Sequence, residues 1–204
     1  SSPVVAKITV SPASAGYAYI ANERSNTVSV INTGDNTVVT TIKVGGGPYS
    51  VSASPDGKRV YVSNLTDNTI SVIDASSYAV IATIPVPASP YGLLVSNDGS
   101  KVYVTNWNSG YVSVINTVTN EVASLLPEGS GTYGVLESPD GSRLYFSNYY
   151  DNTVSVVSTA NNTVLGNVRV GSQPTGMAIT PDGSQLYVVN STTGNVSVIN
   201  TANN

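Results

Sequence analysis

Short stretches of alternating apolar and polar residues, separated by turn-forming residues, run through the whole chain. Residues 50–54 alternate strictly, and residues 59–64, 69–74 and 78–86 are rich in β-branched side chains. Alternation with a period of two and β-branched enrichment predict strands. Pro55-Asp56-Gly57 predicts a tight turn between the first two, because proline presets φ and glycine allows positive φ. Residues 48–86 therefore predict four consecutive strands, named A to D in chain order.

The same four-strand unit recurs at an invariant spacing. The tetrapeptide Tyr-x-x-Asn at the end of strand B begins at residues 19, 61, 103, 145 and 187, in steps of 42 residues. A repeat of this length with four strands is typical of a β-propeller blade. We predict an all-β fold, a single β-propeller domain over residues 1–204 with five four-stranded repeats of 42 residues. The B strands are expected to begin near residues 17, 59, 101, 143 and 185.

The two ends of the chain leave one strand unassigned. The pattern predicts about nineteen strands, whereas five complete blades need twenty. Residues 4–10 resemble a strand D, such as residues 38–44, but Ser11-Pro12 follows them as at the end of a strand A. They therefore form either strand A of blade one or a strand D that closes blade five. In both cases one strand is absent. Three interpretations stay open: a neighbouring copy completes the ring, the chain is part of a larger propeller, or the last blade has three strands.

Composition narrows the classes of function. The chain has no Cys and no His, and charged residues make up 10% of it, with a net charge of −4. A Ser-His-Asp triad, a thiol nucleophile and a zinc–thiolate site are therefore excluded within this chain. The few basic residues are scattered, which argues against nucleic acid, and no apolar run reaches the length of a membrane helix. We predict no enzymatic activity, no metal and no cofactor.

The repeated polar residues have structural explanations. Asp56, Asp98, Asp140 and Asp182 occupy the same tight turn, where an Asp side chain bonds its own backbone. The Asn of Tyr-x-x-Asn ends strand B, and we expect its side chain to bond the backbone of the following loop. Neither set is predicted to be catalytic.

Several motifs resemble the YVTN family of β-propellers. They are Tyr-Val-Thr-Asn at 103–106, Asn-Thr-Val-Ser-Val-Ile-Asn at 26–32, Gly-Gly-Gly-Pro-Tyr at 45–49 and Ser-Pro-Asp-Gly at 54–57. The resemblance covers nearly the whole chain and implies a prokaryotic extracytoplasmic protein of the surface-layer type. It also implies a relation to lactonase-like seven-bladed propellers. Five repeats are fewer than is usual in such propellers.

Aromatic residues gather in the loops that vary between repeats. The loops between strands B and C differ in every repeat and contain Trp107, Tyr149 and Tyr150, while Tyr49, Tyr91 and Tyr133 recur in the D–A connections. Both sets of loops emerge on one face, because successive strands are antiparallel. We predict that Tyr91, Trp107, Tyr133, Tyr149 and Tyr150 form a contact surface for a glycan or a protein. A second interpretation is that the recurring tyrosines plug the central tunnel and the others pack between blades.

Glu137 departs from its repeat. Its counterparts are Ala53, Val95 and Ile179 in the innermost strand, so its carboxylate meets solvent in the tunnel or needs a buried partner. A general base with a raised pKa and a cation ligand are the functional interpretations. Glu23, Arg24 and Glu128 are expected to be solvated charges on the aromatic face.

These observations favour an extracellular or cell-surface structural or interaction protein, from which a signal peptide has been removed. It would act in self-assembly or adhesion, with further copies of itself, another surface protein or glycans as partners, and without nucleic acid or membrane insertion. A lectin-like propeller that uses the aromatic face is the first alternative. A lactonase-like enzyme is the second.

Overall fold

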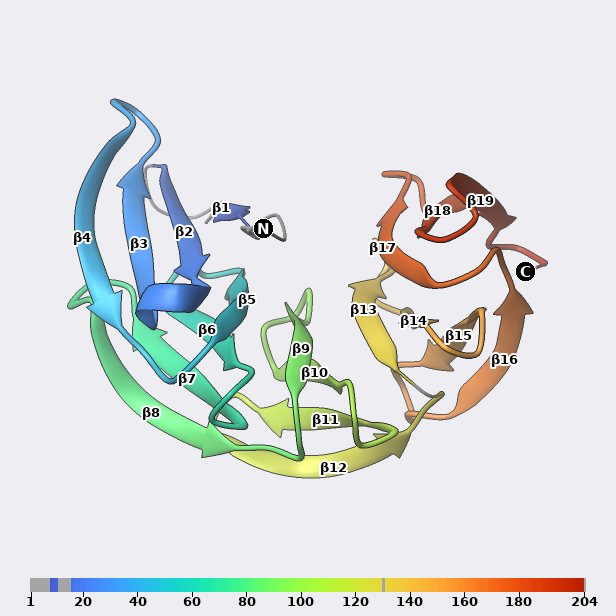
Figure 1. Cartoon of the computed structure of the whole chain (residues 1–204), viewed down its shortest axis with the longest axis horizontal. Helices are drawn as coiled ribbons and strands as arrows, with labels where there is room; N and C mark the ends of the chain where they lie inside the picture. The colour runs from blue at the N-terminus through green and yellow to red at the C-terminus, as the bar shows by residue number, and fades with distance from the viewer. Residues whose placement is uncertain (1–7, 11–15, 130, 204) are drawn as a thin grey trace.

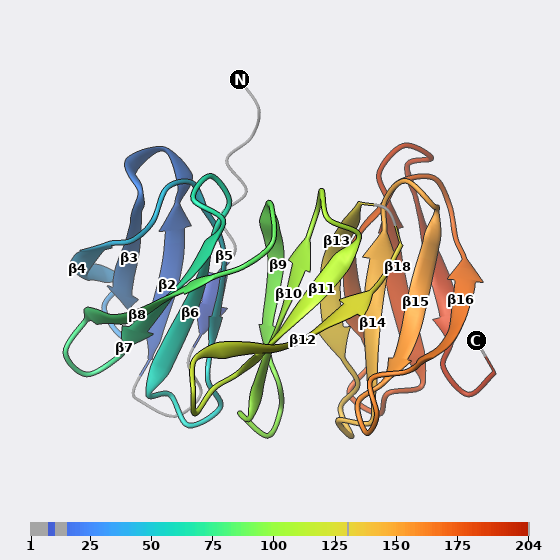
Figure 2. The same ribbon diagram turned by 90° about the horizontal axis from the view of Figure 1, so that it is seen from below.

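The computed structural model describes residues 8–10, 16–129 and 131–203 of the chain. Five antiparallel sheets stand side by side as the blades of an open arc (Figure 1). Their strands cross the height of the molecule, with loops at both ends (Figure 2). The only described helical segment is the 3-10 turn η1 (Glu23–Ser25). No described helix is long and apolar enough to cross a membrane.

Each blade is a meander of strands in chain order. Blade one contains β1 (Ile8–Val10), β2 (Tyr17–Asn22), β3 (Thr27–Asn32) and β4 (Thr37–Lys43). Blade two contains β5 (Pro48–Ala53), β6 (Arg59–Asn64), β7 (Thr69–Asp74) and β8 (Ala79–Pro85). Blade three contains β9 (Pro90–Val95), β10 (Lys101–Asn106), β11 (Tyr111–Asn116) and β12 (Glu121–Pro127). Blade four contains β13 (Thr132–Glu137), β14 (Arg143–Asn148), β15 (Thr153–Ser158) and β16 (Val164–Arg169). Blade five contains β17 (Pro174–Ile179), β18 (Gln185–Asn190) and β19 (Asn195–Asn200).

The N-terminal strand belongs to blade one. β1 pairs antiparallel with β2, with Ile8 opposite Ile20 and Val10 opposite Ala18, so it is strand A of its own blade. The interpretation that it closes blade five as a strand D is wrong for residues 8–10, and residues 4–7 lie outside the described residues. A short connection to the neighbouring strand costs less chain entropy than a closure across the whole arc. Among the described residues, blade five remains three-stranded.

The hydrophobic core lies between blades rather than within them. At the first junction, Tyr19, Val28 and Val30 of blade one pack against Val60 and Val62 of blade two. The same positions meet at the three following junctions. At the second, third and fourth junctions a hydroxyl on strand B also donates to a backbone carbonyl of the next strand A, as where Ser63 Oγ donates to the Tyr91 carbonyl over 3.1 Å. One face of each of the first four sheets is therefore covered by the sheet that follows it.

The repeated Asn at the end of strand B ties that strand to strand C. Asn148 Nδ2 donates to Thr153 Oγ1 over 3.2 Å and to Ser155 Oγ over 2.8 Å. Asn64 makes the same two bonds in blade two. The expected bond to the loop backbone is thus replaced by bonds to strand C side chains, because the Asn is buried in the sheet beside them.

The A–B turns form as expected. In blade four, Asp140 Oδ1 accepts hydrogen bonds from Ser138 Oγ over 2.5 Å and from the Ser142 backbone N–H over 3.0 Å. Gly141 has a φ of 71°, a conformation that glycine adopts without a steric penalty. The hydroxyl bond is the main cause that lowers the pKa of Asp140 to about 2, and the Thr180 hydroxyl does the same for Asp182.

The outer face of blade five has no successor among the described residues. Tyr187 is 39% exposed, whereas its counterparts in the other four repeats are at most 1% exposed. Val196 and Val198 are likewise exposed, although Val154 and Val156 at the same positions of blade four are buried. Figure 1 shows this blade at one end of the arc, facing the gap toward blade one. The exposed side is one half of a blade junction, and no other described residue covers it.

The repeated tyrosine should therefore matter unequally. We expect Tyr103→Ala to lower the free energy of unfolding by about 3 to 5 kcal/mol, because it empties a buried site between two blades. Tyr187→Ala should cost about 1 kcal/mol or less, because its ring is largely solvated. Urea denaturation of both variants measures the difference, and equal losses would contradict the view that blade five is uncovered.

The turn aspartates predict a particular acid sensitivity. Because the folded-state pKa of Asp140 and Asp182 is lowered to about 2, the stability they contribute is complete above the unfolded pKa of about 4. It is lost as pH falls from there toward the folded value. We expect the wild-type Tm to fall between about pH 4 and pH 2. The fall should be smaller in Asp140→Asn, and an identical fall in both proteins would argue against this role.

Candidate functional site

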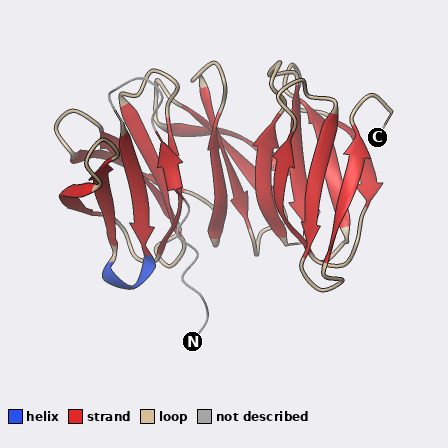
Figure 3. Cartoon of the chain, turned by 90° about the horizontal axis from the view of Figure 1, so that it is seen from above, coloured by secondary structure: helices blue, strands red, loops and turns tan. Residues whose placement is uncertain are grey.

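Six aromatic side chains from three adjacent blades meet on one face of the arc. They are named the aromatic surface and comprise Tyr49, Tyr91, Trp107, Tyr133, Tyr149 and Tyr150. Trp107 comes from the loop between β10 and β11, and Tyr149 and Tyr150 come from the loop between β14 and β15. The other three occupy the second position of β5, β9 and β13. Figure 3 shows how the loops gather at the two ends of the strands.

Trp107 is at the centre of the aromatic surface. Its ring centroid lies 5.5 Å from that of Tyr91 and 5.9 Å from that of Tyr133. It lies 5.1 Å from Tyr149 and 5.3 Å from Tyr150. These are tilted and edge-to-face contacts, the geometries that aromatic pairs prefer. The structure thus brings together all five residues that the sequence analysis singled out.

The polar tips of these rings are partly engaged. The hydroxyls of Tyr49 and Tyr133 are 3.1 Å apart, and the Tyr149 hydroxyl donates to Gln173 Oε1 over 2.7 Å. Burial raises the pKa of Tyr91 to about 12. Tyr150 is 57% exposed, while the other five are half-buried. The surface therefore offers flat apolar area with Tyr150 as its most accessible ring.

Tyr49 extends this group beyond the predicted five. Its ring centroid is 3.9 Å from that of Tyr91, so the contacts continue into blade two. The sequence signal was its position, shared with Tyr91 and Tyr133 in the repeat. The tyrosines meet because the innermost strands of adjacent blades lie close together. At Gly92 of β9 the space is so narrow that an added Cβ would lie 2.5 Å from the Tyr133 carbonyl oxygen of β13.

Glu137 has a partner on the opposite face. Its Oε2 accepts a hydrogen bond from the backbone N–H of Asn97 over 2.6 Å. Asn97 stands where three other repeats have proline, which has no N–H to donate. Its side chain also donates to the Ser138 carbonyl over 3.0 Å. The two departures from the repeat are therefore partners that join the A–B turn of blade three to blade four.

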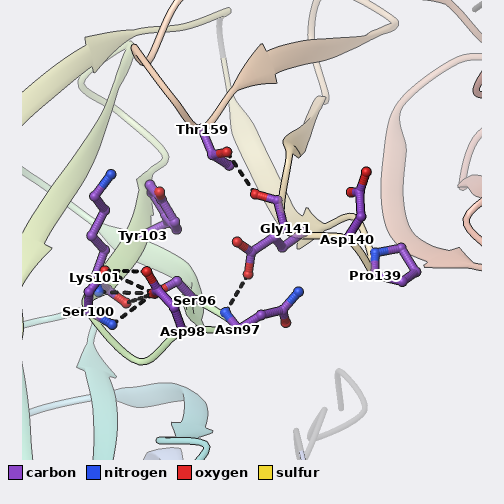
Figure 4. A pocket seen from close by; sticks show the side chains of 11 residues that line it. Ser96, Asn97, Asp98, Ser100, Lys101, Tyr103, Pro139, Asp140, Gly141 and Thr159 are labelled. Atoms are coloured by element: carbon purple, nitrogen blue, oxygen red, sulfur yellow. Dashed lines mark hydrogen bonds between the residues drawn. The ribbon is translucent and has the colours of Figure 1, made fainter.

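This pair borders a hollow of about 450 Å³ between the two blades. Figure 4 shows Asn97 and Asp98 on one side of it and Asp140 on the other, with Asp98 hydrogen-bonded to its own turn. Burial raises the pKa of Glu137, and the Asn97 N–H opposes that shift. The hydrogen bond to Asn97 thus gives Glu137 a structural role between blades three and four.

Glu23 and Arg24 are exposed. Glu128, however, is not the solvated charge that the sequence pattern predicts. Its Oε1 is buried and has no hydrogen-bond partner among the described residues. Burial raises the pKa of Glu128, and the nearby Ser155 hydroxyl opposes the shift. The carboxylate lies at the junction of blades three and four, close to the loop that carries Tyr150.

The described residues contain no group of three or more Asp, Glu, His or Cys side chains that could hold a metal ion. The aromatic surface itself offers stacking on its rings and hydrogen bonding at the tyrosine hydroxyls beside them.

Two family models match the chain. A model described as a YNCE-like β-propeller matches residues 13–143, and a model described as a lactonase, a 7-bladed β-propeller, matches residues 123–204. No curated protein matches the chain. The lactonase match covers less than half of the chain and includes Glu137 and three of the six aromatic residues, Tyr133, Tyr149 and Tyr150.

A solved structure shares the fold. The chain titled Kuenenia stuttgartiensis hydrazine synthase matches with a TM-score of 0.82 and 22% sequence identity, over 95% of this chain and 65% of that one. This protein thus spans about two thirds of the length of the matched chain. A sequence identity of 22% shows that the two share the propeller fold and nothing more. The YNCE-like model extends over more than half of the chain, from blade one into blade four, and the chain belongs to the YNCE-like β-propeller family.

Proposed function

We propose that this protein is a non-enzymatic interaction scaffold of the cell exterior that adheres to a partner through its aromatic surface. The observation that carries the proposal is the set of ring contacts centred on Trp107. Tyr and Trp provide large rigid contact area at low entropic cost, and exposed patches of them are typical of binding surfaces. A polar surface with 10% charged residues supports an extracellular location of the surface-layer type.

A lactonase-like activity is less well supported. Glu137, the carboxylate that departs from its repeat in the innermost strand, already accepts a hydrogen bond from the Asn97 N–H. The chain also lacks the His that most often serves as a general base.

Self-assembly is a second candidate function, and one observation favours it. The exposed face of Tyr187, Val196 and Val198 corresponds to the face that packs against Val60, Val62 and Ile73 at the first internal junction. In blade one the counterparts of those three residues are Ala18, Ile20 and Ile31. Blade five of one copy can thus present to blade one of the next the pairing that the chain repeats internally. Such head-to-tail contacts generate rings or open filaments.

Adhesion through the aromatic surface can be followed with Trp107, because it is the only tryptophan. We expect its emission to change when the protein is titrated with a cell-envelope fraction of the source organism. Trp107→Ala and Tyr150→Ala should weaken co-sedimentation with that fraction by about 2 kcal/mol, or thirtyfold, as for central aromatic contacts.

Tyr111→Ala is the matched control, since Tyr111 is 43% exposed in β11 and makes no contact with the aromatic surface among the ring contacts described. It should bind as the wild type does. Co-sedimentation that survives the loss of both Trp107 and Tyr150 would place adhesion elsewhere on the molecule.

Self-assembly predicts association that depends on concentration and on blade five. In sedimentation velocity, the wild-type protein should form larger species as its concentration rises. Tyr187→Arg and Val198→Asp should remain monomeric, because each puts a charge into the apolar contact. Val118→Asp changes a side chain that is 85% exposed in blade three and should associate normally. A wild type that stays monomeric throughout would remove this candidate.

A further inference from the structure

Glu128 occupies a position that three other repeats give to valine. The backbone N–H of Val44, Val86 and Val170 each donates to the loop between strands B and C of its own blade, and that of Glu128 donates to Gly110 in the same way over 2.9 Å. The three valines pack against the hydrophobic core. The backbone therefore places the side chain of Glu128 toward a junction that elsewhere is apolar. Packing at this junction therefore does not explain why residue 128 carries a carboxylate.

Glu128 lines a hollow of about 320 Å³ between blades three and four. Its polar lining includes Glu128, Asn148, Asp151, Ser155 and Asn167. The Ser155 hydroxyl has one proton, and Asn167 Oδ1 accepts it over 2.8 Å. Glu128 lies near the same hydroxyl, but Asn167 accepts its proton, and Glu128 Oε1 has no hydrogen-bond partner among the described residues. The hollow is therefore bordered by a carboxylate oxygen that lacks a donor, which suits a ligand that brings hydroxyl donors.

The hollow adjoins the most exposed ring of the aromatic surface. Asp151, which lines the hollow, follows Tyr150 directly in the chain. Both residues contact the connection between blades three and four. A Cβ on Gly129 would lie 2.6 Å from Asp151 Oδ2, and one on Gly131 would lie 2.5 Å from the Tyr150 ring. Trp107 lies beside that ring, with 5.3 Å between centroids.

We propose that the hollow at Glu128 is the hydrogen-bonding half of a saccharide site, whose stacking half is formed by Trp107 and Tyr150. A sugar has an apolar face for the aromatic rings and hydroxyls that donate to a carboxylate and an amide oxygen. The inference rests on the proposed adhesive function and names the chemistry of its partner. A cation is less well matched, because the described residues assemble no group of three acidic, His or Cys ligands.

The test is an array of defined mono- to tetrasaccharides built from glucose, galactose, mannose and N-acetylglucosamine, followed by calorimetric titration of the best binder. The wild type should bind at least one of them. Glu128→Val restores the residue of the other repeats, so it should fold with an unchanged or higher Tm. It should nevertheless bind at least about tenfold more weakly, because a charge-assisted hydrogen bond is lost. Trp107→Ala should weaken binding by a similar factor.

Glu121→Val is the matched control. It removes the same charge from an exposed site in β12 and should leave saccharide binding unchanged. Binding that survives Glu128→Val would overturn the proposal. So would binding of Ca²⁺ alone, lost in Glu128→Val, with no saccharide bound. If no saccharide binds but the envelope fraction still changes Trp107 emission, the saccharide site is contradicted and the adhesive function is supported. If neither the saccharides nor the envelope fraction bind, the saccharide site and the adhesive function are both contradicted.

Discussion

Each of the first four blades of this protein buries an apolar face against the next blade. The four hydrophobic clusters all straddle junctions, and each combines one strand B tyrosine with apolar side chains of the following repeat. A single four-stranded sheet has two faces and cannot complete a core alone, so stability is built from the contacts between neighbours, as in other repeat proteins. The same constraint explains why the last sheet presents Tyr187 to solvent.

The packing positions are held nearly constant by this constraint, so departures from the repeat stand out. Most of them lie at the junction of blades three and four: Asn97 with Glu137 on one face, and Trp107 with Glu128 on the other. The first pair satisfies its own hydrogen bonds and therefore has a structural explanation. Glu128 keeps a buried oxygen that has no hydrogen-bond partner among the residues that the structure describes. Within one junction, hydrogen-bond satisfaction thus separates a structural substitution from a candidate binding group.

The sequence indicated much of the candidate site but not its most specific part. Trp107, Tyr149 and Tyr150 could be found because loops that vary among otherwise constant repeats stand out. Its place in a loop predicts a solvated charge at Glu128, although its three counterparts in the repeat are valine. The sequence does not show which residues surround the Glu128 carboxylate. Ser155 and Asn167 come from two strands of the next blade, and only the packing of blade four on blade three encloses the carboxylate.

Local periodicity by itself determined the strands, the tight Asp-Gly turns and the five-fold repeat, because each depends on residues that are close in the chain. The tertiary structure alone decided contacts between distant residues. It assigned residues 8–10 to blade one through their pairing with β2. It also turned the repeated Asn toward strand C and joined rings from three blades around Trp107. Alternating patterns specify which face of a strand is apolar, but not which neighbouring sheet will cover that face.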